Sequence, residues 1–283
     1  MSKIIDGKAT SVAVREKIKR EVAEFTAKHN ITPGLAVIIV GENAASQVYV
    51  RNKHKACTEV GIYSEIHELP ENTTECSLLA LIDKLNDDKK IHGILVQLPL
   101  PKHLDEEKVI LRIDPKKDVD AFHPENVGKI MIGNFSFLPC TPAGVMELLR
   151  HYGISPAGKH CVIIGRSNIV GKPQAMLMLK ENATVTICHS KTANLKDITK
   201  QADIIVAAVG KAKFVTADMV KKDSIVIDVG INRLEDGKLC GDVDFVNVEP
   251  ITSHITPVPG GVGPMTITML LKNTLTAAQE QNQ

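Results

Sequence analysis

The stretch of sequence that decides the fold is residues 161–173, which read CVIIGRSNIVGKP. An apolar run typical of a buried strand ends at Gly165, where the backbone must turn, and the helix that follows offers free N–H groups and a dipole to a phosphate. Ser167 stands where a dinucleotide-binding loop usually has its second glycine, and the closing glycine, Gly171, comes one residue late. The pattern therefore suits both a dinucleotide site and an ordinary strand-to-helix turn.

The end of the next apolar run indicates which dinucleotide would bind. Residues 187–192 read ICHSKT, at the distance where NAD enzymes place an acidic residue for the ribose. A carboxylate there would repel the 2′-phosphate of NADP, whereas Arg166, Ser190 and Lys191 can donate hydrogen bonds to it. The sequence favours NADP over NAD, although Ser190 and Lys191 alone would also suit a plain polar loop.

Apolar runs and helical periodicities alternate along most of the chain. This alternation predicts an α/β fold with parallel sheets covered by helices. Residues 114–139 carry Pro, Gly and Asn without clear periodicity, so we expect a functional loop there, leading to a second domain. We expect strands near residues 35–40, 62–68, 93–96, 160–164, 184–188, 203–209 and 224–229, and helices near 6–29, 44–60, 74–85, 142–150 and 264–278.

The composition excludes several classes of protein. With 283 residues, 43% hydrophobic and 24% charged, the chain fits a globular protein of two ordinary domains. A net charge of +1 gives no reason to expect nucleic acid or an anionic membrane as a partner. Without a signal peptide or a spanning apolar run, we expect a cytoplasmic protein. The six cysteines lack metal-ligand spacing, so we expect free thiols and no metal site.

Four polar residues are candidates for catalysis. Tyr49 and Lys53 are four residues apart and project from one helical face. Gln97 follows the strand expected at 93–96, at the end where ligands bind in open α/β sheets. Asp120 adds a carboxylate. Each also suits a structural role, as an exposed helix face, a loop amide or a surface acid.

A glycine-rich stretch near the C-terminus, residues 257–266, reads PVPGGVGPMT. Its glycines would let the backbone approach a flat ligand closely. The same residues could also serve only to lead into the last helix, which Pro264 suits as a first-turn residue.

Together these segments resemble the bifunctional methylenetetrahydrofolate dehydrogenase/cyclohydrolase family, in family order and along nearly the whole chain. The resemblance implies an N-terminal α/β catalytic domain, residues 1–138 with 264–283, and a Rossmann-like NADP domain with a parallel sheet, residues 139–263. The active site would lie in the cleft between them. The segments that carry the resemblance are IDGK (5–8), VYVRNK (48–53), QLPLP (97–101), KDVD (117–120), PCTP (139–142), the loop at 165–173 and PVPGGVGPMT (257–266).

The resemblance also implies an activity. Members oxidise 5,10-methylenetetrahydrofolate to the 5,10-methenyl cation with NADP and hydrolyse it to 10-formyltetrahydrofolate, in one active site. They would be homodimers serving one-carbon metabolism and the synthesis of purines, methionine and histidine. By resemblance, Lys53 is catalytic with Gln97, Tyr49 packs on the folate rings and Asp120 binds the pterin. The residues implied to contact NADP are Gly165, Arg166, Ser167, Ser190 and Ile231, and those implied to line the folate pocket are Gly261 and Pro264.

The chemistry constrains Lys53 further. The methenyl intermediate is a cation, so a protonated ammonium beside it would be repelled. We therefore expect a neutral amine that orients or deprotonates the attacking water, held in place by Gln97. Two other functions fit the same fold: an NADP-binding sensor without turnover, and a dehydrogenase acting on another small metabolite such as a hydroxy acid or shikimate.

Overall fold

The computed structural model describes residues 2–282, and of residues 44 and 45 only the backbone. The chain forms two compact units. One comprises Ala13–Cys140 with Ile267–Gln283, and we call it the three-stranded unit after its sheet. The other comprises Met1–Val12 with Thr141–Thr266, and we call it the six-stranded unit.

The sheet of the three-stranded unit has the order β3-β2-β4, and both pairings are parallel. The central strand is β2 (Gly34–Val40), with β3 (Tyr63–Leu69) on one side and β4 (Gly93–Val96) on the other. Every residue of β2 is buried, because helices cover both faces of a parallel sheet and leave no face for polar side chains.

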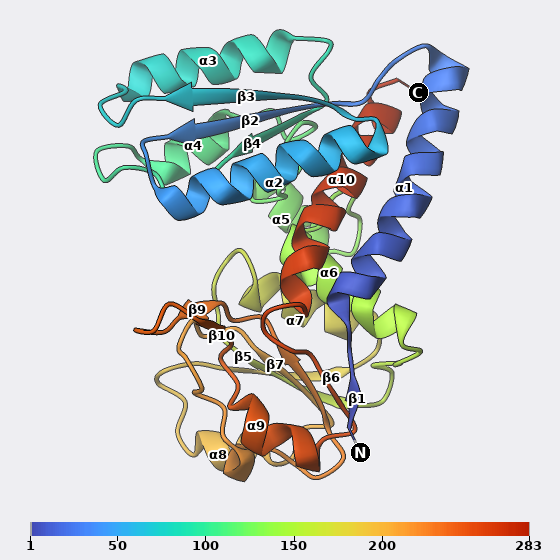
Figure 1. Ribbon diagram of the computed structural model, residues 1–283, viewed down its shortest axis with the longest axis vertical. Helices are drawn as coiled ribbons and strands as arrows, with labels where there is room; N and C mark the ends of the chain where they lie inside the picture. Colours follow the sequence, from blue (N-terminus) through green and yellow to red (C-terminus); the bar gives the residue numbers. More distant parts are fainter. Residues whose placement is uncertain (1, 283) are drawn as a thin grey trace. The chain divides into compact units, whose positions relative to one another are not determined.

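Helices α2 (Ala44–Val60) and α3 (Glu75–Asp87) lie on opposite faces of this sheet (Figure 1). On the α3 side, Ala36, Ile38 and Val40 of β2 join Leu78, Ile82 and Leu85 of α3 in one apolar core. Because successive side chains of β2 point to opposite faces of the sheet, alternate residues pack against the helices on one face and the others against those on the opposite face. The other helices with residues in this unit are α1 (Gly7–His29), α4 (Glu106–Arg112), α5 (Pro124–Met131) and α10 (Val262–Glu280).

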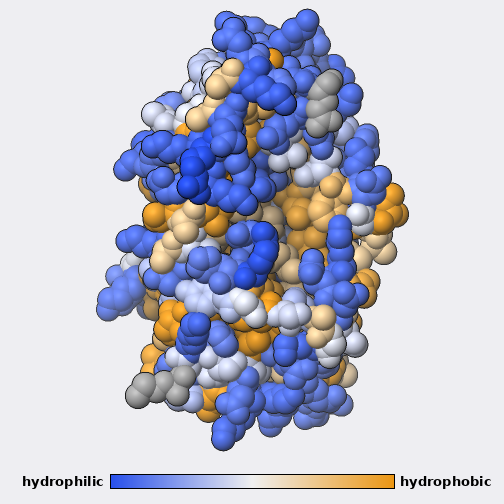
Figure 2. All heavy atoms as spheres, turned by 90° about the vertical axis from the view of Figure 1, so that its right-hand side faces the viewer, coloured by the Kyte–Doolittle hydropathy of each residue, from blue (hydrophilic) through white to orange (hydrophobic). Residues whose placement is uncertain are grey.

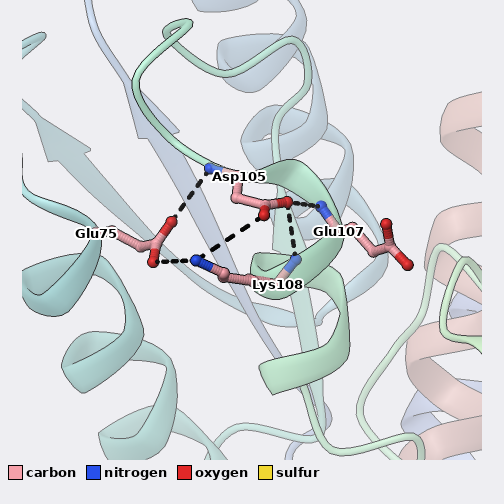
Figure 3. A network of polar contacts seen from close by, with 4 residues as sticks. All are labelled: Glu75, Asp105, Glu107 and Lys108. Atoms are coloured by element: carbon pink, nitrogen blue, oxygen red, sulfur yellow. Dashed lines mark hydrogen bonds and ion pairs between the residues drawn. The ribbon is translucent and has the colours of Figure 1, made fainter.

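A polar network fixes the beginning of α4, which follows the loop after β4 (Figure 3). The Asp105 carboxylate caps the helix by accepting from the N–H groups of Glu107 and Lys108, at 3.0 and 3.3 Å. Glu75 of α3 accepts from the Lys108 ammonium at 3.1 Å and from the Asp105 N–H at 3.3 Å. Because the network is exposed, it contributes little stability but sets where α4 starts against α3.

The sheet of the six-stranded unit has the order β1-β11-β8-β7-β5-β6, and every pairing is parallel. Its buried strands supply an apolar core that includes Val162, Ile205 and Val226. The strands are β1 (Lys3–Ile4), β5 (His160–Ile164), β6 (Thr184–Cys188), β7 (Ile204–Ala207), β8 (Ile225–Asp228) and β11 (His254–Ile255).

The connections in this unit are mostly short helices. Beside the sheet, β9 (Asn232–Arg233) and β10 (Leu239–Cys240) form an antiparallel pair. The helices are α6 (Cys140–His151), α7 (Gly171–Lys180), α8 (Leu195–Thr199) and α9 (Phe245–Val248), with short 3-10 turns at Ala217–Met219 and Glu249–Ile251.

The structure confirms the predicted α/β fold and its parallel sheets, and it corrects the expectation of a loop throughout residues 114–139. Helix α5 lies within that range. Pro124 suits its first turn, and the Nδ1 atom of His123 accepts from the Glu125 N–H at 3.2 Å. Eight residues between turns are too few for a helical period to stand out in the sequence.

The first twelve residues make their contacts with the six-stranded unit. The reason is that β1 pairs with β11, in the register Lys3↔His254 and Ile4↔Ile255. The boundaries predicted from sequence group them with residues 13–138 as one domain, and that grouping stays a prediction. A two-residue strand has no periodicity from which to predict its partner.

The face drawn in Figure 2 is largely hydrophilic, with hydrophobic residues in smaller patches between the hydrophilic ones. Within residues 2–282, no helix is both long and apolar enough to cross a bilayer. The same stretch of chain holds no group of three or more His, Cys, Asp or Glu side chains arranged to bind a metal ion.

Candidate active site

Lys53 and Gln97 meet in the three-stranded unit. Lys53 is half-buried on α2, and its Nζ atom donates a hydrogen bond of 3.0 Å to Oε1 of Gln97. Gln97 directly follows β4, where its N–H donates to the carbonyl of Ile38 at 2.8 Å and its Nε2 donates to the carbonyl of Leu98 at 2.8 Å. Since both ends of the amide are engaged, its oxygen is held towards the lysine. Tyr49, one turn earlier on α2, is 42% exposed and available to a flat ligand.

The segment before Asp120 is held by its own neighbours. Lys117 is buried, and its ammonium donates to the carbonyls of Leu85 and Asp88 at the end of α3, at 3.0 and 2.8 Å. Burial lowers the pKa of Lys117. Asp118 is also buried and accepts from the N–H of His123 and from Nδ2 of Asn126, at 2.8 and 2.9 Å. Lys117 and Asp118 thus serve the local structure and leave Asp120 for other partners.

Asp120 lies within the electrostatic reach of Lys53. Burial raises the pKa of its carboxyl group, and the charge of Lys53 acts in the opposite direction. The thiol of Cys140 donates to Oδ1 of Asp120 and to the carbonyl of Val119, both at 3.6 Å. Because burial raises the pKa of Cys140 well above its usual value, this thiol stays protonated and remains a donor. The sequence predicts a free thiol at Cys140 and assigns it no contact with Asp120.

In the six-stranded unit, two glycines close the loop after β5. Gly165 has φ +135°, and a Cβ there would lie 2.2 Å from the carbonyl oxygen of Ala208. A Cβ on Gly171 would lie 2.3 Å from the carbonyl oxygen of Gly165. Between them, Oγ of Ser167 accepts from the N–H groups of Val170 and Gly171, at 3.2 and 3.3 Å, which leaves its hydroxyl proton free to donate. Both glycines are needed for the chain to turn this tightly.

The donors predicted for a 2′-phosphate lie at neighbouring strand ends. The N–H of Gly165 donates to the carbonyl of Cys188 at 2.9 Å, which joins the ends of β5 and β6. Arg166, Ser190 and Lys191 follow these two ends, and all three are exposed. A tight backbone turn beside a free guanidinium and hydroxyl is a set of donors that fits the phosphates of NADP.

Ile231 and the glycine-rich turn lie next to each other. Ile231 follows β8 and is 47% exposed. A Cβ on Gly263, at the start of α10, would lie 3.6 Å from Cδ1 of Ile231. Pro264 follows that glycine directly and Gly261 lies two residues before it, so the predicted cofactor residue Ile231 and the predicted folate residues come from one neighbourhood of this unit.

The N-terminal IDGK motif supports the same turn, a role that the sequence did not reveal. The N–H of Lys8 donates to the carbonyl of Gly260 at 3.0 Å. A Cβ on Gly7 would lie only 1.7 Å from the carbonyl oxygen of Gly261. Gly7 is therefore a glycine because the backbone of the glycine-rich turn passes against it.

Asp228, at the end of β8, is a second feature that sequence reasoning missed. It is 3% exposed and accepts from the N–H groups of Gly230, Asp242 and Val243, at 3.0, 2.9 and 2.9 Å. Burial raises its pKa to about 6, and the charge of Asp242 acts in the same direction. The sequence did contain a signal for Asp228, because an acidic residue stands at the end of an otherwise apolar strand.

The stability of the folded state should respond to the Asp228 carboxyl group. The folded protein binds its proton more tightly than the unfolded chain, so this group favours folding most below about pH 4, and that contribution is lost as the pH rises towards 6. Two pKa units correspond to about 3 kcal/mol. We expect the free energy of unfolding of the wild type, relative to Asp228→Asn, to fall by about this amount between about pH 4 and pH 7 in urea titrations. A difference that did not vary with pH would contradict the assignment.

The chain matches two family models over most of its length. Residues 5–120 match the catalytic domain of tetrahydrofolate dehydrogenase/cyclohydrolase, and residues 139–282 match its NAD(P)-binding domain. The bifunctional protein FolD of Acetivibrio thermocellus is 61% identical over 280 residues, covering 99% of this chain and 98% of that protein. FolD of Campylobacter concisus is 62% identical, covering 98% of each chain.

Solved structures agree with these relatives. The FolD methylenetetrahydrofolate dehydrogenase/cyclohydrolase of Campylobacter jejuni is 53% identical, with a TM-score of 0.97 over 99% of this chain and 100% of that one. The Trypanosoma brucei enzyme, solved with NADP and an inhibitor, is 41% identical, with a TM-score of 0.95 over 99% and 98%. On the family models and on relatives of this identity and coverage, the chain belongs to the tetrahydrofolate dehydrogenase/cyclohydrolase family.

Proposed function

We propose that Lys53, Gln97, Tyr49 and Asp120 together serve both reactions of this bifunctional enzyme. The chain is an NADP-dependent methylenetetrahydrofolate dehydrogenase and a methenyltetrahydrofolate cyclohydrolase. It oxidises 5,10-methylenetetrahydrofolate to the methenyl cation and hydrolyses that cation to 10-formyltetrahydrofolate. The observation that carries our assignment of residues is the 3.0 Å hydrogen bond from Lys53 to Gln97, with the carboxyl group of Asp120 within electrostatic reach of the lysine.

In the hydrolytic step, water attacks the electrophilic methenyl carbon and must lose a proton. A neutral Lys53 amine has two N–H bonds and one lone pair. When one N–H is given to Gln97, the lone pair remains to accept the proton of the attacking water. In the adduct that forms, the bond from this carbon to N5 then breaks as the hydroxyl proton passes to N5 and the formyl C=O forms on N10, so that one proton in all is left on the lysine. A neutral amine is also the form that the cationic substrate tolerates, because two like charges in a site with little water repel strongly.

We assign the binding of the folate to a carboxylate, an aromatic ring and the glycine-rich turn. Asp120 accepts hydrogen bonds from N–H groups of the pterin, and the exposed ring of Tyr49 packs against the flat part of the folate. Gly261 and Pro264 present backbone and a rigid ring, which suit close approach to a planar ligand.

The six-stranded unit holds the cofactor. In our proposal, Gly165 and Ser167 receive its pyrophosphate, Arg166 and Ser190 donate to its 2′-phosphate and Ile231 packs against its nicotinamide end. When bound, NADP supplies the hydride acceptor for the dehydrogenase reaction. That reaction needs orientation of the folate more than an acid or a base from the protein.

The proposed function is tested by mixing the purified protein with 5,10-methylenetetrahydrofolate and either NADP or NAD. We expect NADPH absorbance to appear, the methenyl product to decay to the 10-formyl form, and kcat/KM to favour NADP by about tenfold or more, the effect of one charge-assisted hydrogen bond. Equal use of the two cofactors would contradict the roles of Arg166 and Ser190. If no NADPH formed, the proposed dehydrogenase function would be wrong.

We also propose a cytoplasmic homodimer that serves tetrahydrofolate interconversion and, through it, the synthesis of purines, methionine and histidine. These features follow from the family resemblance. The free state of the thiols, including exposed Cys76, supports a reducing compartment.

A further inference from the structure

The side chain of Asp242 is an anion enclosed by N–H donors. The residue is fully buried, and its carboxylate accepts from three consecutive backbone N–H groups, those of Val209, Gly210 and Lys211, at 2.6, 2.9 and 2.8 Å. A fourth bond comes from Nδ2 of Asn232 at 2.9 Å. A carboxylate with four donors is well satisfied, and each donor would be left unpaired if the carboxylate were lost.

These donors come from two segments that follow neighbouring strands of the sheet. Residues 209–211 follow β7, and Asn232 comes shortly after β8, the strand that pairs with β7. The carboxyl ends of parallel strands are where dinucleotides bind in folds of this kind. Asp242 therefore links the segments that follow these two strands, although it lies on neither strand.

The absence of a side chain at Gly230 leaves room for the carboxylate of Asp242. A Cβ on Gly230 would lie 2.2 Å from Oδ1 of Asp242, so only glycine fits there. Gly230 and Asn232 both meet Asp242, and Ile231 between them is exposed. Asp228 completes the arrangement by accepting from the N–H of Asp242 itself at 2.9 Å.

We propose that Asp242 is a positioning residue for NADP, which holds the loops after β7 and β8 in the shape that receives the cofactor and presents Ile231 to it. The inference rests on the proposed function of the six-stranded unit. Asp242 need not touch the cofactor, because its N–H partners already surround it. The loss of the carboxylate should loosen residues 209–211 and the segment around Ile231 together, and NADP would then have to order both loops on binding.

The test uses the full-length Asp242→Asn variant, which keeps the size of the side chain but replaces an acceptor oxygen with an NH₂ donor. We expect the Kd of NADP, measured by calorimetry, to rise about tenfold or more. Hydrogen exchange at the amides of residues 209–211 should accelerate by a similar factor. Cyclohydrolase activity, assayed without NADP, should stay within about twofold of the wild type, as for a substitution away from its residues.

Two further variants make the result interpretable. Asp236→Asn removes the same charge from an exposed position between β9 and β10, and should bind NADP like the wild type. Asn232→Leu removes one donor and leaves the three backbone bonds. If Asp242→Asn does not fold, this milder variant carries the test, with an expected rise in Kd of about threefold or more.

The possible results distinguish a failure of the positioning role of Asp242 from a failure of the proposed function. If a folded Asp242→Asn variant binds NADP as tightly as the wild type, the positioning role is overturned while the proposed function stands. If Asp242→Asn does not fold and the Asn232→Leu variant binds NADP with an unchanged Kd, the positioning role is overturned as well. If the wild type itself binds no NADP, the proposed function fails, and the inference fails with it.

Discussion

Replacing Lys53 by methionine is expected to lower the cyclohydrolase rate constant by about 100-fold or more, the usual contribution of a positioned general base. Methionine has a similar length, but it can neither accept a proton from water nor bond to Gln97. Dehydrogenase turnover should fall by less than about tenfold, because hydride transfer depends on orientation and needs no proton transfer. The two activities of one protein should therefore separate in one variant.

The measurement needs both activities assayed independently on the same preparation, with NADPH formation for one and decay of added methenyltetrahydrofolate for the other. Lys55→Met is the matched control, since Lys55 is exposed two residues further along α2. That control should behave as the wild type. If Lys53→Met kept full cyclohydrolase activity, Lys53 would not be the base, and equal losses in both activities would indicate a role in binding instead.

Replacing Gly165 by alanine should weaken cofactor binding strongly while sparing hydrolysis. The new Cβ would meet the carbonyl oxygen of Ala208 at 2.2 Å, at a backbone φ of +135° that residues with side chains rarely adopt. The contact is with backbone, so no side chain can rotate away and the loop must shift. We expect the Kd of NADP to rise by about 50-fold or more, which corresponds to about 2.3 kcal/mol.

Calorimetry with NADP measures this effect directly, and the cyclohydrolase assay shows whether the rest of the protein is intact. Gly128→Ala is the control, because a Cβ there meets nothing within 4 Å. In helix α5 that change should leave both activities unaltered and, if anything, stabilise the fold slightly. Tight NADP binding by Gly165→Ala would show that the cofactor does not use this loop.

The longer strands, β2 to β8, were predictable because each has a local signal in the sequence. The apolar runs that became β2 and β5 are buried over nearly their whole length, as strands covered on both faces must be. Helix α5 and the pairing of β1 with β11 were not predictable, since eight residues and two residues are too short for periodicity to distinguish them from turns. Local signals thus identify long elements and miss short ones.

The site divides in the same way. By itself the sequence determined that Tyr49 and Lys53 share a helix face, that Gln97 ends a strand and that the loop at Gly165 turns into a helix, because all three depend on local geometry. The tertiary structure was needed to show the hydrogen bond between Lys53 and Gln97, 44 residues apart, which only the family resemblance had led us to expect. It alone showed that Asp242 accepts from the amides of residues 209–211. Such bonds depend on which strands are neighbours and how their ends align, and no local pattern in the chain records that order.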